Sequence, residues 1–376
     1  MHADRLALLL LLSINAAWLA PWRRLPKLSR KRRPYVRIPT TQLLSSTEAA
    51  LVAAGLATAS ADIIARGLVA SQRDGRPAHG ISRLPLMVRS LRDGEVNADA
   101  EPQLTRTRPA VLQADAQCGF ALPAISAALP ALAIATREHG VASLSVVNAH
   151  GIIGALWTSL ERLASEHGLA VIAFCNSPAF VCPAGGVGRV FGTNPLGFAW
   201  PRAHAPPLVV DFACSASSRG DMQQAARQGE RLPPGSALDA RGRPTTDAAA
   251  GLQGFQLPFG GHKGACVALL VELLAAAWTG TELGCEASDP MNRGLVLLAL
   301  DLGAHGRTPA AAQASAERLF AAVRAAGGRL PADGRYHHRR RGEALGSTVA
   351  VSAELLAELE ALEGFAAADR SSSRPG

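Results

Sequence analysis

The stretch GGVGRVFG at residues 185–192 decides which kind of α/β fold this chain can adopt. A Rossmann dinucleotide-binding domain needs glycines in the order G-x-G-x-x-G, directly after a strand and at the start of a helix. Here the order is G-G-x-G-x-x-x-G, and no clean strand precedes it. The sequence therefore disfavours a Rossmann domain.

Strands and helices are predicted on both sides of this stretch. Short apolar runs predict strands at 144–147, 169–174, 196–200 and 208–212. Helical periodicity is found at 161–167, 265–278, 310–326 and 353–363. Nearer the N-terminus, two helices are predicted within 41–73, capped by Ser46 or Thr47 and by Ser60. Strands and helices mix without steady β-α-β alternation, which predicts a mixed α/β fold.

The positive charge of the chain belongs to its N-terminal segment. The 376 residues carry a formal net charge of +8, from 38 basic and 30 acidic residues. Residues 1–40 hold nine of the basic residues and one of the acidic, which leaves 38 − 9 = 29 basic and 30 − 1 = 29 acidic residues in the body. A neutral body with 5% aromatic residues and no reader motif excludes nucleic acid as its partner.

Residues 1–37 form a basic and partly apolar extension whose role the sequence leaves open. Its apolar run over 6–20 is short of the ~20 residues that span a bilayer, and the residues before it make a poor signal-peptide start. A transit peptide, a membrane anchor and an unstructured or mis-assigned start remain alternatives. We expect the cytoplasm, and membrane contact only if the extension is retained.

The six cysteines indicate a reducing compartment. They include no C-x-x-C pair, so neither a zinc ribbon nor a thioredoxin-type site is predicted, and no metal site is assigned. Six cysteines are too few for a disulfide scaffold in a chain of this length.

His79 and Arg83 are the first candidate pair for chemistry. If residues 80–83 begin a helix, the two side chains lie on one side of it, one turn apart. That arrangement places a proton donor beside a guanidinium that can hold a carboxylate. A histidine before glycine in a loop is more often structural, so the pair alone is weak.

Asp211 and Lys263 are further candidates. Asp211 ends the apolar run 208–210, where a carboxylate can orient an imidazole or, more often, cap a helix. Lys263 is the only lysine after residue 40 and lies in LPFGGHKG, 257–264, before an apolar helix. Such a helix start favours an anion, and we assign Lys263 to cofactor binding. The basic run 335–341 either meets phosphate or forms a solvated face.

Four segments in order resemble the malate/L-lactate dehydrogenase family, which is unrelated to the Rossmann-type lactate dehydrogenases. They are HGISRLP at 79–85, FGTNP at 191–195, RGRPTTD at 241–247 and LPFGGHKG at 257–264. The resemblance covers about 38–365. Within the family, 154–157 with Glu161, 176–186 and 198–202 resemble the Δ1-piperideine-2-carboxylate/Δ1-pyrroline-2-carboxylate reductases.

The resemblance implies a fold and a domain order. The expected fold is α/β (mixed), with a non-Rossmann NADPH-binding domain of predominantly antiparallel sheet, a helical lobe from both chain ends, and a homodimer. After the extension 1–37, we expect the helical lobe with the catalytic histidine at 38–110. The cofactor and substrate lobe follows at 111–340, and 341–376 returns to the helical lobe and ends in a loose tail.

The resemblance also implies roles for individual residues. His79 is the expected proton donor, Asp211 the carboxylate that supports it, and Arg83 the ligand of the substrate carboxylate. Cys182 or Pro183 falls where the family contacts substrate. Besides Lys263, the expected cofactor contacts are His150, Gly154, Ala155, Leu156, Pro201, Arg202, Arg329, Gly334 and Arg335.

The expected activity is NADPH-dependent reduction, with NADH possible, of a small cyclic imino acid to L-pipecolate or L-proline. A 2-keto acid/2-hydroxy acid dehydrogenase is the alternative. Ala78 stands where the family usually has the serine that helps orient the histidine. Phe212 and a slightly lengthened stretch at 148–153 also depart from the family pattern. Ala78 therefore keeps a third hypothesis open, a catalytically impaired homologue that acts by binding.

Overall fold

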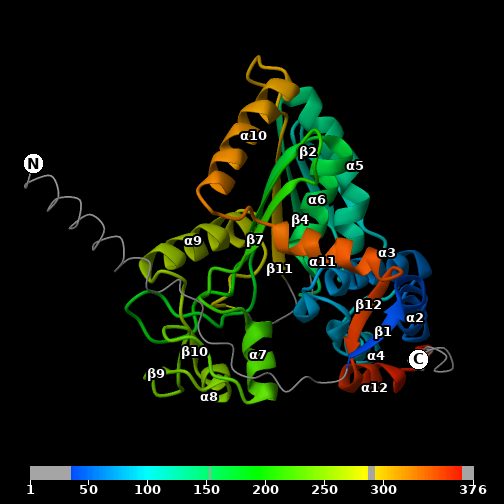
Figure 1. The fold of residues 1–376 in the computed structure, drawn as a ribbon, viewed down its shortest axis with the longest axis vertical. Coiled ribbons are helices and arrows are strands. Elements are labelled where there is room, and N and C mark those ends of the chain that lie inside the picture. The colour runs from blue at the N-terminus through cyan, green and yellow to red at the C-terminus, as the bar shows by residue number, and fades with distance from the viewer. Residues whose placement is uncertain (1–34, 152–153, 287–292, 366–376) are drawn as a thin grey trace, which may run out of the picture. The chain divides into compact units, whose positions relative to one another are not determined.

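The structure is a computed structural model that describes residues 35–151, 154–286 and 293–365 (Figure 1). The compact unit begins after Tyr35, and strand β1 (Tyr35–Pro39) crosses the boundary expected at 37/38. Predictions for the extension concern residues that lie almost entirely outside this description, as does most of the C-terminal tail. Within the described ranges, no helix is both long enough and apolar enough to cross a membrane.

A seven-stranded sheet forms the centre of the larger lobe (Figure 1). Across the sheet the strands are β2 (Gln103–Arg108), β3 (Val111–Asp115), β4 (Val141–Ala149), β11 (Arg293–Leu300), β5 (Ala170–Cys175), β6 (Leu196–Trp200) and β7 (Leu208–Phe212). Only β3 and β4 run parallel, and all other neighbours in this sheet are antiparallel. The predicted predominantly antiparallel, non-Rossmann sheet is confirmed.

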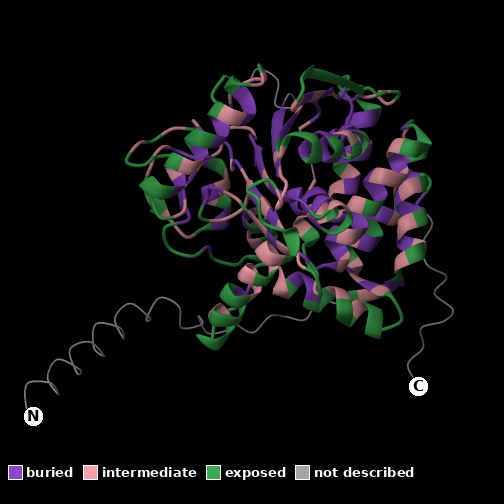
Figure 2. Cartoon of the chain, turned by 90° about the horizontal axis from the view of Figure 1, so that it is seen from above, coloured by how far each residue is buried: buried purple, intermediate pink, exposed green. Residues whose placement is uncertain are grey.

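Helices cover both faces of this sheet because its central strands are apolar on both sides. Helices α5 (Ala121–His139) and α6 (Leu156–His167) bury one face, with Leu129, Leu144 and Leu297 in a shared core. Helix α9 (His262–Glu272) and the π-helix η4 (Leu273–Ala277) cover part of the other, against Phe174 and Val296. Figure 2 shows the buried residues gathered between these layers.

The second lobe is built from both ends of the described chain. Its elements are β1, α2 (Thr40–Ala53), α3 (Thr58–Arg73), α4 (Leu84–Arg92), β12 (Thr348–Ser352) and α12 (Ala353–Glu360). Strands β1 and β12 pair, and one core joins Leu43 and Ile64 to Val351 and Leu359. The predicted helical lobe is confirmed.

The remaining elements lie at the edges of the two lobes. Helices α7 (Arg219–Gln228) and α8 (Ala248–Gln253) pack with a small sheet of β8 (Ala237–Leu238), β9 (Pro244–Thr245) and β10 (Phe255–Gln256). Helices α10 (Pro309–Ala325) and α11 (Asp333–Ala344) precede β12.

The helix starts near the N-terminus were predicted wrongly. Helix α2 begins at Thr40, directly after β1, so Ser46 and Thr47 lie inside it, and the Thr47 hydroxyl donates to the Leu43 carbonyl. Ser60 is likewise inside α3. Strand pairing fixes where α2 starts, which a local capping signal cannot show. The predicted cap at Ser352 is confirmed, because its Oγ accepts from the Leu355 N–H.

Two sequence motifs have structural explanations at α9. A Cβ on Gly264 would lie 2.4 Å from the Phe259 carbonyl oxygen and 2.9 Å from that of Cys214, so the backbone passes where only glycine fits. In the FGTNP motif, Asn194 Nδ2 donates to the Ala268 carbonyl and, over 2.9 Å, to Glu272 Oε1. These contacts fix the loop that follows β5 against α9.

Candidate active site

His79 and Arg83 lie on two short 3-10 helices rather than on one helix. The helices are η2 (Pro77–His79) and η3 (Ile81–Arg83), and Gly80 interrupts them with an extended backbone. A Cβ on Gly80 would come 2.6 Å from the Gln72 Oε1 atom, so the glycine is needed for close packing on α3. The Arg83 Nε donates to the Ala78 carbonyl over 2.7 Å, which holds the guanidinium against the histidine turn.

His79 is neutral at pH 7 in this environment. Burial lowers its pKa from 6.5 to about 4, and the charges of Arg83 and Arg76 act in the same direction. The carboxylate of Asp221 opposes them by favouring the imidazolium. The expected proximity of His79 and Arg83 is therefore present, and it disfavours the charged histidine.

Helix α7 forms a wall beside this pair. A Cβ on Gly220 would lie 2.9 Å from the Ala78 Cβ and 3.5 Å from an Arg83 Nη atom. Asp221 lies in the first turn of α7, where its N–H donates to the Ser218 cap. The sequence analysis missed Asp221, although a serine three residues before an acid is a signal for a helix start.

Of the two predicted substrate contacts, Cys182 is fully buried and Pro183 is half-buried. The Cys182 N–H and Sγ both donate to the Gln256 carbonyl, and burial raises the pKa of the thiol. Gln256 Nε2 in turn donates to the Ser217 carbonyl, just before α7. Cys182 is thus tied to the wall that meets Ala78 and Arg83, and its thiol is directed into the protein.

Asp211 caps helix α6 from the end of strand β7. Its Oδ2 accepts the Trp157 backbone N–H over 3.1 Å. Burial raises the pKa of Asp211, while that N–H and the charges of Arg335 and Arg76 favour the carboxylate. No hydrogen bond joins Asp211 to His79 in the described residues, so its support of the histidine stays a prediction. Arg76, whose charge acts on both groups, was missed.

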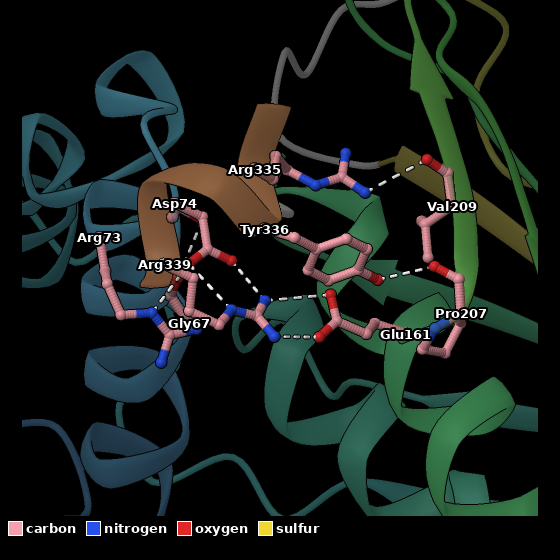
Figure 3. A network of polar contacts seen from close by, with 10 residues as sticks. Gly67, Arg73, Asp74, Glu161, Pro207, Val209, Arg335, Tyr336 and Arg339 are labelled. Carbon is pink, nitrogen blue, oxygen red and sulfur yellow. Dashed lines mark hydrogen bonds and ion pairs between the residues drawn. The ribbon is translucent and has the colours of Figure 1, made fainter. Parts of the chain in front are cut away.

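The start of α6 and helix α11 both contact strand β7, and Figure 3 shows Arg335 of α11 directed at Val209. The Arg335 guanidinium lies 4.7 Å from the centre of the Trp157 ring and donates to the Val209 carbonyl over 3.3 Å. Arg335 Nε and Trp157 Nε1 are buried and have no acceptor among the described residues. Gly154, Ala155 and Leu156 immediately precede or begin α6. The unpaired donors of Arg335 and Trp157 fit the anionic groups of a dinucleotide, whereas the first turn of α6 already donates to the Asp211 carboxylate.

Arg202 is held by an acidic partner. Its Nε and an Nη donate to the two Glu317 carboxylate oxygens over 2.6 and 2.7 Å, and its guanidinium packs on the Phe320 ring. This pairing lowers the pKa of Glu317. Pro201 beside it is buried. Glu317 was not foreseen, because it lies on α10, far away in sequence.

Four predicted cofactor residues lie apart from these contacts. His150 is buried beside the Phe120 ring and 4.0 Å from the Glu95 carboxylate. Lys263 is exposed in the first turn of α9, and Arg329 is exposed before α11. Gly334 is exposed, with open space around its Cα. Their cofactor roles remain predictions.

In the part of the chain that the structure describes, no group of histidine, cysteine, aspartate and glutamate residues is arranged to hold a metal ion. All six cysteines are free thiols.

Comparison with known proteins identifies the family of this chain. The family model for malate/L-lactate dehydrogenase matches residues 38–360. A Δ1-pyrroline-2-carboxylate/Δ1-piperideine-2-carboxylate reductase of Pseudomonas aeruginosa is 42% identical over 310 residues, which cover 79% of this chain and 91% of that protein. A (2R)-3-sulfolactate dehydrogenase (NADP+) of Chromohalobacter salexigens is 40% identical over 320 residues, which cover 82% of this chain and 94% of that protein.

A solved structure shares the fold closely. The crystal structure of Δ1-piperideine-2-carboxylate reductase from Pseudomonas syringae matches with a TM-score of 0.81 at 37% identity, over 87% of this chain and 99% of that one. The resemblance read from four short motifs is confirmed over residues 38–360. The chain belongs to the malate/L-lactate dehydrogenase family and is an NAD(P)-dependent oxidoreductase.

Proposed function

We propose that this enzyme reduces Δ1-pyrroline-2-carboxylate or Δ1-piperideine-2-carboxylate to L-proline or L-pipecolate, with NADPH as the reductant. The observation that carries the proposal is Arg83, a largely desolvated guanidinium beside His79 with no acidic partner among the described residues. Burial lowers the pKa of Arg83, and an anionic ligand would offset that cost. The names of the relatives above support the cyclic imine as that ligand.

In this mechanism the substrate carboxylate pairs with Arg83 through charge-assisted hydrogen bonds. Neutralising Arg83 removes one of the charges that disfavour the His79 imidazolium, so substrate binding favours proton uptake by the histidine. His79 then supplies the proton to the substrate nitrogen. The cofactor supplies hydride to the adjacent carbon. Arg335 and Trp157, with their unpaired donors, are the groups that would hold it.

A second candidate substrate is a 2-oxo acid that carries another anionic group. Arg227 of α7 acts electrostatically on Arg83, so a second cation is close to the carboxylate site. The sulfolactate dehydrogenase relative is named for a compound with both a carboxylate and a sulfonate. The same His79 and Arg83 would then act on a carbonyl group.

The main test is NADPH oxidation by the full chain with the two cyclic imines, pyruvate and 3-sulfopyruvate. We expect turnover of an imine. Arg83→Met should raise KM by about 10- to 100-fold, since it removes a charged hydrogen-bond donor. His79→Gln should lower kcat by about 10²- to 10⁴-fold, since it removes the general acid.

Arg89→Met, an exposed arginine on α4, is the matched control and should change neither constant. Turnover of a 2-oxo acid alone would overturn the imine assignment in favour of the second candidate. Absence of both turnover and NADPH binding in wild type would favour an impaired homologue.

The charges around His79 should set the pH dependence. Because its pKa is below the ordinary value, kcat/KM for reduction should rise as pH falls from 7 toward about 4, as the imidazolium fraction grows. Asp221→Asn removes a charge that raises this pKa and should move the midpoint down. Arg76→Gln removes one that lowers it and should move the midpoint up. NMR titration of the His79 ring measures both midpoints. Midpoints that are unchanged or that move in the opposite directions contradict this prediction.

The choice of NADPH over NADH should depend on Glu317. A 2′-phosphate bound at Arg202 must displace this carboxylate, so Glu317→Gln should tighten NADPH binding by up to about fivefold and leave NADH unchanged. Fluorescence titration gives both Kd values. Glu138→Gln, which alters a surface pair on α5, is the control. Unchanged affinity for both cofactors would remove Arg202 from the cofactor site.

We also propose a homodimer. Leu269, Leu270, Leu273 and Trp278, on and after α9, are 43–58% exposed and form an apolar surface suited to a second copy of the chain. Leu273→Glu should shift the protein toward monomer in sedimentation equilibrium, whereas Leu319→Glu on α10 should not. A wild-type monomer at micromolar concentration would contradict this proposal.

We place the enzyme in the cytoplasm, where NADPH and free thiols are maintained, and cell fractionation of the full chain tests this.

A further inference from the structure

Arg339 of α11 joins two carboxylates that belong to different elements (Figure 3). Its Nη atoms donate to both oxygens of Glu161 on α6 over 2.6 and 3.1 Å. Its Nε and one Nη donate to Asp74, directly after α3. The Asp74 side chain is fully buried, and those of Glu161 and Arg339 are 15% and 21% exposed. A single guanidinium therefore links the helical lobe to the sheet lobe in a largely water-excluded place.

On the helical-lobe side, Asp74 begins the turn that carries His79. Two backbone hydrogen bonds hold this turn. The Arg76 N–H donates to the Ser71 carbonyl, and the His79 N–H donates to the Arg76 carbonyl. Gly75, which follows Asp74, lies against α11, where an added Cβ would come 2.8 Å from the His338 ring. A displacement of Asp74 would therefore also displace the backbone that carries His79.

On the sheet side, Arg339 shares α11 with groups at the candidate cofactor site. The Tyr336 hydroxyl donates to the Pro207 carbonyl over 2.8 Å, and Arg335 donates to Val209 on β7. Glu161 belongs to α6, whose first turn contains Trp157 under Arg335 and is capped by Asp211. A shift of α11 or α6 on ligand binding would therefore act on Arg339.

We propose that Arg339 is a positioning residue that fixes the His79 turn relative to α6 and α11 and thereby couples cofactor binding to the histidine. The proposal rests on the proposed function for the location of the cofactor. A buried ion pair is weak evidence for stability, because desolvation offsets much of the attraction. Because Arg339 contacts a carboxylate of each lobe, it also fixes the position of one lobe relative to the other, a role beyond stability.

The test compares Arg339→Met with Arg340→Met, an exposed neighbour on the same helix. We expect Arg339→Met to lower kcat by about 10- to 100-fold, the cost of misplacing a catalytic group, with a smaller change in substrate KM because Arg83 is intact. Arg339→Lys keeps the charge but loses the two-sided fork, so it should give an intermediate kcat. Arg340→Met should match wild type.

A readout independent of turnover is the NMR signal of the His79 ring, assigned with His79→Gln. In wild type and Arg340→Met, NADPH should shift this signal, and in Arg339→Met it should not. A wild-type signal that does not respond to NADPH, or an Arg339→Met signal that responds fully, overturns the proposal. If NADPH shifts the signal but no cyclic imine turns over, the proposed substrate fails while the coupling stands.

A third variant separates positioning from stability, because Arg339→Met leaves Glu161 unpaired and leaves Asp74 with Arg73 alone. The triple variant Arg339→Met/Asp74→Asn/Glu161→Gln removes those charges and should recover the urea midpoint. We expect its kcat to stay low and its His79 signal to remain unresponsive to NADPH. Recovery of kcat together with stability would show a structural role only and would overturn the proposal.

Discussion

A polar group that is withdrawn from water must find a partner inside the protein, and this constraint organises the structure around its site. Asp211 meets it by capping α6, Glu272 by accepting from Asn194 and the Gly284 N–H, and Asp74 by pairing with Arg73 and Arg339. Apart from Arg73, which is the sequence neighbour of Asp74, each partner comes from another segment of the chain, so these bonds also fix the position of one segment on another. The buried donors left over on Trp157 and Arg335 lie together, where a ligand can complete the set.

The same constraint explains the chemistry of the histidine turn. His79 and Arg83 are held close by the Ala78 carbonyl and by packing of Gly80 on α3. A protonated His79 beside Arg83 would place two positive charges in a poorly hydrated environment, which lowers the pKa of the histidine. The imidazole of the free enzyme is therefore neutral, and an anionic ligand would stabilise the Arg83 guanidinium. Ala78 offers no hydroxyl to orient His79, and Asp221 on α7 supplies a negative charge from the opposite wall.

Local sequence predicted the parts of this protein whose shape is decided locally. The strands at Leu196–Trp200 and Leu208–Phe212 match the expected bounds, because a short apolar run that follows a proline has few other solutions. The starts of α2 and α3 were predicted wrongly, because tertiary pairing overrode capping preference. His79 and Arg83 are close in sequence, so their proximity could be predicted, while their roles stay predictions. Trp157, Arg339 and Glu317 act across elements far apart in sequence, and a single sequence carries no signal for such pairs.

The pairing of β1 with β12 has a consequence for how the protein is made. Their contact at Arg37 and Thr348 spans 311 positions of the sequence, and the core under it draws on α2, α3 and α12. During synthesis from the N-terminus, the helices that carry the histidine turn emerge early but lack their covering strand until almost the whole chain has left the ribosome. The sheet lobe has its strands in order by then. The helical lobe is thus translated first and completed last, and its apolar core stays partly uncovered until β12 and α12 have been made.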